Sequence, residues 1–207
     1  MITDWDKYYS KAFPTTVVTR KISSYKVCGL LKKYNEISNP NITELGGANS
    51  SFATRIIDKL SPILYDIVDN CSSGLKLSER RFKNHNTINI YSENVLEPCS
   101  RGTKYDIVFS VGLIEHFDKN DTARCVKTHF DKCKKGGVVL LTFPHPTLPY
   151  NAIRKLAEIT DRWIFHDERA LNFKEVRETA DKYGSEIHQS INWWIGLTQG
   201  YLVYRCF

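Results

Sequence analysis

Short apolar runs alternate with amphipathic stretches through the middle of the chain, and this alternation constrains the fold more than any other feature. The strand candidates are residues 42–45, 63–68, 88–91, 105–111 and 138–143. The 105–111 run is apolar nearly throughout, as expected of a strand buried on both faces of a sheet. The stretches between the runs repeat apolar residues at helical spacing. The pattern predicts parallel strands joined by helices, and 207 residues suit one α/β domain.

The two ends of the chain differ from this middle. The later elements are expected to be helices over 151–163 and 175–183 and a terminal antiparallel hairpin of strands over 186–195 and 201–206. Residues 1–40 contain a helix but no strand, so we expect a helical lid over one end of the sheet, with residues 41–207 as the main domain. Gly136 and Gly137 are expected to cap a helix. The expected fold class is α/β, with a doubly wound, mostly parallel sheet, an antiparallel C-terminal hairpin and helices on both faces.

The composition is that of an ordinary globular protein, with 42% hydrophobic and 25% charged residues and a net charge of +6. The basic residues occur in scattered pairs, which fits either solvated helix faces or a patch that attracts an anionic substrate. The six cysteines form no C-x-x-C pair and no Cys/His ligand spacing, so we expect reduced thiols and no metal site. The opening residues resemble no secretory signal and no apolar stretch is long enough for a bilayer, so we expect a soluble, cytoplasmic protein.

Three segments place polar groups where doubly wound folds bind ligands, at the carboxyl ends of their strands. The first, residues 44–51, puts glycines directly after a strand and before a helix N-terminus, although a simple strand-to-helix turn would have the same pattern. The second is Asp69, which could accept hydrogen bonds from ribose hydroxyls, cap the next helix, or do both. The third is the turn after residues 105–111, which carries Glu115 and His116.

In this order, the three segments resemble the class I methyltransferases that use S-adenosylmethionine (SAM). Glu44, Gly46 and Ala48 stand in the places of that family's E-x-G-x-G-like motif, with alanine replacing the second glycine. Asp69 stands where the family binds ribose. Asn94 stands where an aspartate usually meets the adenine amine, so the adenine contact departs from the family pattern.

Two further stretches extend the resemblance over essentially the whole chain. Residues 134–140 are similar to the turn into the family's fifth strand, and residues 5–11 to an opening that folds over the cofactor. The resemblance implies a Rossmann-like methyltransferase domain over 41–207 with SAM as its cofactor. The residues that it implies for the cofactor are Tyr9, Glu44, Gly46, Gly47, Ala48, Asn49, Asp69, Asn70, Asn94, Val95, Ser110 and Val111.

The chemistry that the resemblance implies is an in-line displacement, which needs a base only if the acceptor atom is protonated at neutral pH. His116 is the candidate base because imidazole titrates near neutrality; alternatively, it only packs within its turn. Glu115 is expected to orient the substrate or to bind backbone amides. His145 and His166 are candidate substrate contacts, and His166 belongs to a polar cluster at residues 165–169 that could equally be a solvated turn.

A small-molecule methyltransferase is the leading functional hypothesis, with a sugar or glycan precursor as one acceptor class. The final third is similar to enzymes of surface-polysaccharide pathways, which favours that class. An RNA or other nucleic-acid methyltransferase is an alternative, although no aromatic and basic patch supports it. A non-catalytic SAM-binding regulator is another, and an oxidoreductase fits less well because the glycine spacing is wrong for a dinucleotide. Monomer and homodimer are both open.

Overall fold

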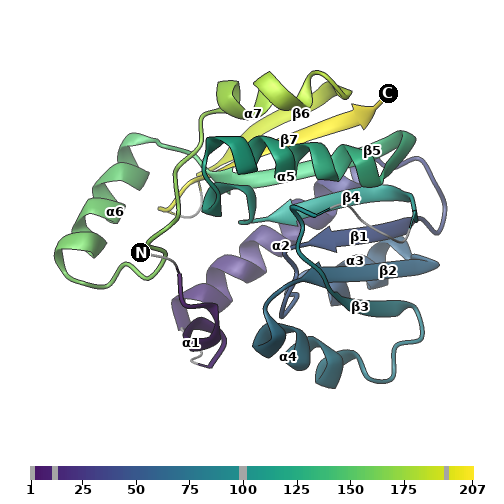
Figure 1. The fold of residues 1–207 in the computed structure, drawn as a ribbon, viewed down its shortest axis with the longest axis horizontal. Coiled ribbons are helices and arrows are strands. Elements are labelled where there is room, and N and C mark those ends of the chain that lie inside the picture. Colours follow the sequence, from purple (N-terminus) through teal and green to yellow (C-terminus); the bar gives the residue numbers. More distant parts are fainter. Residues whose placement is uncertain (1–2, 11–13, 98–101, 194–195) are drawn as a thin grey trace.

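The strands form one sheet in the order β3-β2-β1-β4-β5-β7-β6, in a computed structural model that describes residues 3–10, 14–97, 102–193 and 196–207 (Figure 1). The strands are β1 (Asn41–Leu45), β2 (Leu64–Asp69), β3 (Ile88–Ser92), β4 (Tyr105–Val111), β5 (Cys133–Pro144), β6 (Gly184–Asn192) and β7 (Gln199–Cys206). Strands β1 to β5 pair in parallel, and β7 runs antiparallel between β5 and β6. The predicted Rossmann-like sheet with an antiparallel C-terminal hairpin is confirmed.

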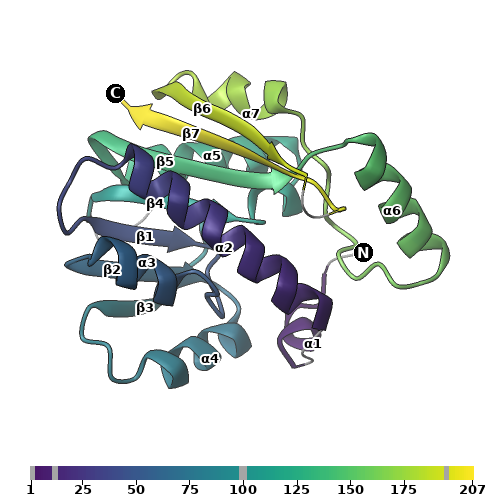
Figure 2. The same cartoon turned by 180° about the vertical axis from the view of Figure 1, so that it is seen from behind.

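Helices cover both faces of this sheet, as predicted. The helices are α1 (Trp5–Ser10), α2 (Pro14–Tyr34), α3 (Ala53–Leu60), α4 (Ser72–Phe82), α5 (Lys119–Lys132), α6 (Leu148–Ile159) and α7 (Phe173–Ala180), with a short 3₁₀ helix η1 (Ile114–His116). Figure 1 shows α5 and α7 in front of the sheet, and Figure 2 shows α2 and α3 over the opposite face. The carboxyl ends of the parallel strands point toward α1 and α6.

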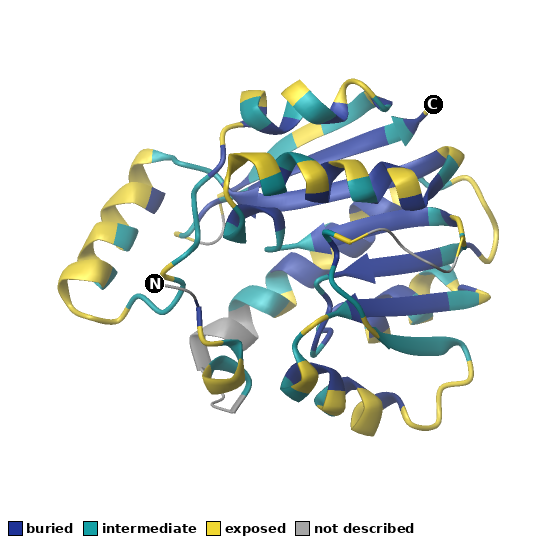
Figure 3. Cartoon of the chain, in the orientation of Figure 1, coloured by how far each residue is buried: buried dark blue, intermediate teal, exposed yellow. Residues whose placement is uncertain are grey.

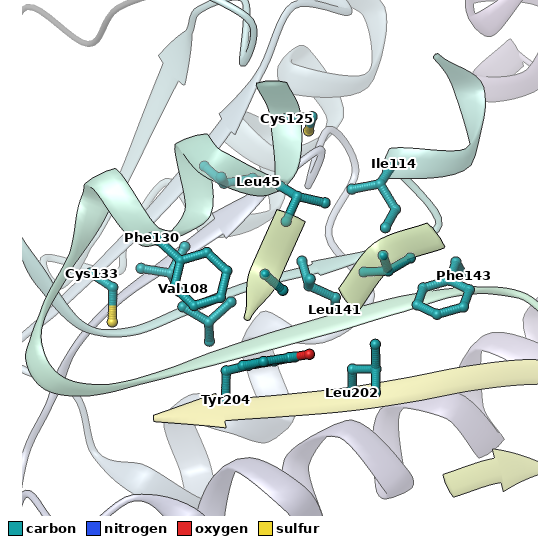
Figure 4. Packing of buried hydrophobic residues seen from close by; sticks show 14 of the residues in the cluster. Leu45, Val108, Ile114, Cys125, Phe130, Cys133, Leu141, Phe143, Leu202 and Tyr204 are labelled. Atoms are coloured by element: carbon teal, nitrogen blue, oxygen red, sulfur yellow. The ribbon is translucent and has the colours of Figure 1, made fainter. Parts of the chain in front are cut away.

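Alternation along the strands divides the core into two clusters. Leu45, Val108 and Leu141 pack with α5 and α7 on one face of the sheet. The residues that precede Val108 and Leu141, namely Ile107 and Leu140, point to the other face of the sheet. There they pack with α2, α3 and α4. Figure 4 shows the first cluster, in which Phe130 of α5 lies over strand residues. Strands that are apolar on both faces are therefore required, which is the pattern seen in the sequence.

The start of β5 differs from the prediction. The strand begins at Cys133, directly after α5, and the pairing jumps from Tyr105 opposite Cys133 to Ile107 opposite Val138. Gly136, with a φ of 76°, lies in the bulge that this jump creates. The prediction of a glycine helix cap was therefore wrong: the glycine lets the strand bulge, and the residue that ends α5 is extended.

The N-terminal segment contains two helices with different positions. Helix α2 crosses one face of the sheet and places the fully buried Val27 and Leu31 in the core. Helix α1 lies instead at the carboxyl ends of the strands, where Tyr9 packs against Gly74 of α4. The part of residues 1–40 that lies over the end of the sheet is therefore α1, while α2 belongs to a covering layer.

Helix α6 projects from the edge of the sheet instead of covering it. Thr147 caps it by accepting a hydrogen bond from Tyr150 N. Its aliphatic side chains are largely exposed, with Leu156 at 62% and Ile159 at 73%, whereas Tyr150 is buried; Figure 3 shows exposure over most of the helix. None of the described helices is long and apolar enough to cross a membrane.

The described cysteines are free thiols, in agreement with the expectation from their spacing. They are Cys28, Cys71, Cys125, Cys133 and Cys206. All of these except Cys71 are buried, so they act as small apolar side chains within the core. Cys99 lies outside the described residues, and nothing in the structure bears on its state.

Candidate active site

A cavity of about 560 Å³ lies at the carboxyl ends of β1, β2 and β4. Its other walls are α1, the start of α2, and the segment between α6 and α7 (Figure 1). Doubly wound folds bind their ligands at this edge, because the loops after adjacent parallel strands meet there. The cavity is also within the size range of ordinary small-molecule sites. It is therefore the candidate active site.

The turn after β1 forms the floor of one end of the cavity. Gly46 has a φ of 72°, which a side chain would strain, and its N–H donates to Val68 O at 2.8 Å. A Cβ on Gly47 would lie 2.8 Å from Ile67 Cγ2. Glycine at both positions is therefore required for the chain to turn sharply against β2.

Glu44 holds this turn from beneath. Its Oε2 accepts hydrogen bonds from Ser50 Oγ at 2.6 Å and from Tyr65 OH at 2.7 Å. Ser50 Oγ in turn accepts from the N–H groups of Phe52 and Ala53 at the start of α3. Burial raises the pKa of Glu44 to about 7, although both hydrogen bonds favour its charged form.

Asp69 at the end of β2 is tied to the same turn. Its Oδ2 accepts from Ala48 N at 3.0 Å, and its Oδ1 accepts from Cys71 N at 2.7 Å. Burial raises the pKa of Asp69, while these N–H groups act in the opposite direction. The carboxylate thus has one backbone partner on each oxygen and still faces the cavity.

Asn94, which follows β3, closes this end of the cavity beside the buried Val95. Asn94 Oδ1 accepts from Leu96 N at 3.0 Å, and its Nδ2 donates to Glu97 Oε1 at 3.2 Å. The side chain therefore shapes its own loop while it lines the cavity. Tyr9 covers the same end from α1, close enough to Asp69 that burial and this carboxylate raise its pKa.

The opposite end of the cavity is formed by η1. Glu115 is 2% exposed, and its Oε2 has no hydrogen-bond partner among the described residues. Burial and repulsion from Glu168 hold its pKa well above the ordinary value. A buried oxygen without a partner is costly, so Glu115 has capacity for one further hydrogen-bonding or charged group.

His116 faces the cavity with one nitrogen fixed. Its Nδ1 lies 2.9 Å from Asp167 Oδ1, and Asp167 also accepts hydrogen bonds from the backbone N–H and hydroxyl of Thr3. Burial would raise the pKa of Asp167, but these hydrogen bonds lower it, so Asp167 is ionised and must accept from Nδ1–H. The neutral ring then carries its lone pair on Nε2. Burial lowers the pKa of His116 despite Asp167, which favours this neutral form.

Glu168 completes the acidic wall. Its Oε1 accepts from Tyr150 OH at 2.6 Å, and burial raises its pKa. One potential ligand atom from each of Glu115, His116 and Glu168 lies within 4.8 Å of the other two, close enough for these residues to surround one cation. The expectation of no metal ligands considered cysteine and histidine spacing and did not anticipate this group.

Aromatic rings surround His116 on its other sides. The ring centroids of Trp5 and Phe165 lie 4.9 Å and 6.0 Å from that of the imidazole. Tyr8 and Trp163 extend this aromatic wall, at 5.4 Å and 6.0 Å from Phe165. The rings come from α1 and from the segment after α6, so these two segments together enclose this end of the cavity.

No protein-family model and no curated protein sequence matches the chain. Several solved structures do match in fold. The magnesium protoporphyrin IX methyltransferase ChlM of Synechocystis PCC 6803, with bound S-adenosylhomocysteine (SAH), superposes with a TM-score of 0.77 at 12% identity over 98% of this chain and 93% of that chain. This chain has the class I methyltransferase fold.

Two other structures extend the comparison. The N-methyltransferase NodS of Bradyrhizobium japonicum WM9, in complex with SAH, gives a TM-score of 0.67 at 10% identity over 88% of this chain and 86% of that chain. An O-methyltransferase family protein of Burkholderia thailandensis gives 0.68 at 10% identity over 100% of this chain and 64% of that chain. Proteins named as an N-methyltransferase and as an O-methyltransferase family member are thus both similar to this chain in fold.

Within this fold, most of the predicted site residues line one cavity. They are Tyr9, Glu44, Gly46, Gly47, Asn49, Asp69, Asn70, Asn94, Val95, Val111, Glu115 and His116. Ala48 and Ser110 are buried and do not line it, although Ala48 N donates to Asp69. His145 points elsewhere, with Nδ1 3.0 Å from Leu171 O, and His166 is exposed outside the cavity.

Several lining residues were missed by the sequence reasoning. Asp167 and Glu168 lie in the polar cluster at 165–169 that was left open between substrate contact and solvated turn. Trp163 was expected only as the last residue of the helix over 151–163, and Tyr150, which precedes that range, was not considered. The available signal was the concentration of aromatic and acidic residues between 163 and 168, which is unusual for a solvated turn.

Proposed function

We propose that this protein binds SAM in the cavity and transfers its methyl group to a small-molecule acceptor. The observation that carries the proposal is that the glycine turn, Asp69 and the Glu115–His116 pair, which are far apart in the sequence, line a single cavity. The first two were expected at the cofactor and the third at the reacting groups, each from its own strand end. Their convergence supports one ligand site with two chemically different ends.

The residues at the β1–β3 end fit the cofactor. Asp69 has one backbone N–H on each carboxylate oxygen, which leaves lone pairs for the two hydroxyls of a ribose. Asn94 and Val95 would border the adenine, and the glycine turn lets the backbone approach the ligand. The acidic lining also suits a cofactor that carries a sulfonium. Tyr9 and Trp5 would cover the ligand from α1.

Bound SAM supplies an electrophilic methyl group, and the protein has to align the acceptor, exclude water and remove a proton. His116 is placed for the last task because Asp167 holds the proton on Nδ1 and leaves Nε2 as the accepting atom. The carboxylate also stabilises the imidazolium that forms. Trp5 and Phe165 shield this imidazole from solvent.

The acceptor that we propose is a small molecule, and a sugar or glycan precursor is the first class to test. An enclosed cavity walled by α1 and the segment after α6 suits a small ligand better than a polymer. The acidic lining also opposes a phosphate-bearing acceptor, which disfavours nucleic acids and nucleotide-linked sugars.

Calorimetry with SAM and with NAD tests the cofactor directly. We expect SAM to bind and NAD not to bind, and Asp69→Asn to weaken SAM specifically. Formation of SAH in the presence of candidate acceptors then tests the reaction. Binding of NAD in preference to SAM, or SAM binding without turnover on any acceptor, would count against a methyltransferase.

A further inference from the structure

The cavity is acidic although the protein is basic. Its acidic lining residues are Glu44, Asp69, Glu93, Glu115, Asp167 and Glu168, whereas Arg20 is the one Lys or Arg among the described lining residues. The chain as a whole carries a net charge of +6. Lysines gather elsewhere, around a second hollow lined by Lys104, Lys134, Lys135 and Lys182. The lining of this cavity is therefore rich in carboxyl groups although the chain as a whole carries a net positive charge.

The acids at the two ends of the cavity are satisfied differently. Glu44 and Asp69 each accept two hydrogen bonds from the chain. Glu115 is fully enclosed yet has an unpartnered Oε2, and it faces Glu168 and His116 across less than 4.8 Å. This oxygen is buried without a partner among the described residues, so a ligand group that pairs with it would offset the cost of its burial.

The aromatic wall adds a second requirement for the missing group. Trp5, Tyr8, Phe165 and Trp163 line the cavity beside the carboxyls, and Trp5 and Phe165 both contact His116. Aromatic faces attract organic cations through their quadrupole and accommodate alkyl groups, whereas a small hydrated metal ion gains little from them. Carboxyls and aromatic rings together match an alkylammonium better than a neutral or anionic ligand.

We infer that the methyl acceptor is an amine, which enters as an ammonium ion between Glu115 and Glu168 and against the wall formed by Trp5, Tyr8, Phe165 and Trp163. This inference rests on the proposed methyl transfer and specifies its substrate class. An amino sugar would satisfy it together with the sugar class proposed above. A sugar hydroxyl alone would place no positive charge between the carboxyl groups of Glu115 and Glu168.

The amine assignment also gives His116 a defined task. An ammonium nitrogen has no lone pair, so one N–H must pass its proton to His116 Nε2 before attack. The freed lone pair forms the N–C bond to the methyl carbon while the C–S bond of SAM breaks and its electron pair stays on sulfur. The products are the N-methylated ammonium, which takes over the positive charge of the sulfonium, and neutral SAH; the imidazolium returns its proton to solvent. Asp167 acts as a positioning residue through Nδ1.

Choline and its uncharged carbon isostere test the inference without requiring the natural acceptor. The two probes have the same shape and differ in the charged nitrogen, and neither can be methylated at that position. Binding to the SAH-saturated protein is measured at neutral pH by calorimetry and by tryptophan fluorescence. We expect choline to bind at least about tenfold more tightly than the isostere, as a desolvated cation between carboxylates and aromatic rings should.

Variants assign the effect to the acidic wall. Glu115→Gln should reduce the preference for choline at least about tenfold and leave the affinity for SAM unchanged, since Glu115 lies at the other end of the cavity from Asp69. Glu178→Gln, an exposed substitution of the same type on α7, is the matched control and should leave both affinities unchanged. If Glu115→Gln unfolds, Glu168→Gln provides a second variant in which the preference for choline over the isostere can be measured.

Three results would overturn the inference. The first is equal affinity for choline and the isostere in the wild type. The second is a preference for choline that survives in both Glu115→Gln and Glu168→Gln. The third is Mn²⁺ that binds stoichiometrically, displaces choline and is lost in Glu115→Gln, which would assign the cluster to a metal ion. SAM affinity is measured in the same samples, so its loss would instead indicate failure of the proposed cofactor site.

Discussion

The two ends of the cavity are built on different physical terms. At the β1–β2 end, Glu44 and Asp69 bind Ser50, Tyr65 and backbone N–H groups, so the polar atoms are satisfied before any ligand arrives. At the β4 end, Glu115 keeps an unpartnered oxygen, and His116 lines the cavity with its Nδ1 fixed by Asp167. The hydrogen bonds of the first end are already formed without a ligand, whereas the second end retains a polar atom that can still bind one.

The contrast implies that substitutions at the two ends of the cavity should impair different properties of the protein. A change at the β1–β2 end should affect stability and cofactor affinity together, because the same hydrogen bonds hold the turn and face the ligand. A change at the β4 end should affect turnover and acceptor binding while the fold and the cofactor affinity remain. The following predictions test this division, beginning with the largest effect.

His116→Ala should lower turnover by about 10²–10⁴-fold, the usual contribution of a positioned general base. Affinity for SAM should stay within about twofold, since the imidazole lies at the other end of the cavity. SAH formation with any accepted amine, together with calorimetry, measures both quantities. Asp167→Asn is the companion variant and should also slow turnover, because an amide no longer fixes the ring tautomer. Full activity of His116→Ala would leave the histidine with a packing role.

The raised pKa of Glu44 predicts that the stability of the fold depends on pH. Its pKa is raised from 4.5 to about 7, so between these values the folded state holds a proton that the unfolded state has lost. Its contribution to the free energy of unfolding should therefore fall as pH rises from 4.5 to 7, by about 3 kcal/mol in total, and level off above pH 7. Arg81 and Asp69 face the same carboxyl and act in opposite directions.

Glu44→Gln isolates this contribution. Urea unfolding of the wild type and the variant across this pH range should show a stability difference that changes by about 3 kcal/mol, with the variant less dependent on pH. Glu115 and Asp69 also have raised pKa values and remain in both proteins, so the difference cancels their contributions. Parallel pH profiles of the two proteins would show that Glu44 is ionised in the fold at acidic pH.

Asp69→Asn should weaken SAM binding by at least about tenfold, roughly 1.4 kcal/mol, because a charge-assisted acceptor is replaced by a neutral amide. The variant should also lose some thermal stability, since Ala48 N and Cys71 N lose a charged acceptor. Asp58→Asn, an exposed change of the same type on α3, is the control. If SAM affinity were unchanged in Asp69→Asn, the carboxylate would serve the turn alone.

The sequence was informative about the β1–β2 end because that end is built locally. Glycines 46 and 47 directly follow β1 and Asp69 is the last residue of β2, and the order of strands brings those strand ends together. The β4 end is non-local: Asp167 meets His116 across 51 positions and Thr3 across 164. Periodicity and strand-end position carry no information on such pairs, so Asp167 and Glu168 were found only as a polar cluster with two interpretations.

The same reasoning explains the errors in the elements. Helix α6 has an apolar pattern, yet its aliphatic side chains are largely exposed because the helix extends beyond the sheet. Periodicity along the sequence carries no information on this tertiary placement. Gly136 was assigned to a helix cap, but its positive φ occurs in a bulge of β5, and both settings accommodate this conformation. In each case the sequence indicated the correct local backbone conformation, a helix or a positive φ. It did not indicate which part of the protein that segment packs against.

The smallest expected effect is that of a substitution at His166, which is close to the site residues in sequence but outside the cavity. His166 lies beside Asp167, but it is exposed and does not line the cavity. His166→Ala should therefore leave turnover, acceptor affinity and SAM affinity within about twofold of the wild type, as is usual for surface substitutions. Measured beside Asp167→Asn, it shows whether neighbouring residues on one loop differ by orientation alone. A large loss of acceptor affinity in His166→Ala would mean that the loop after α6 rearranges when the acceptor binds, and that the β4 end is completed by closure instead of being preformed.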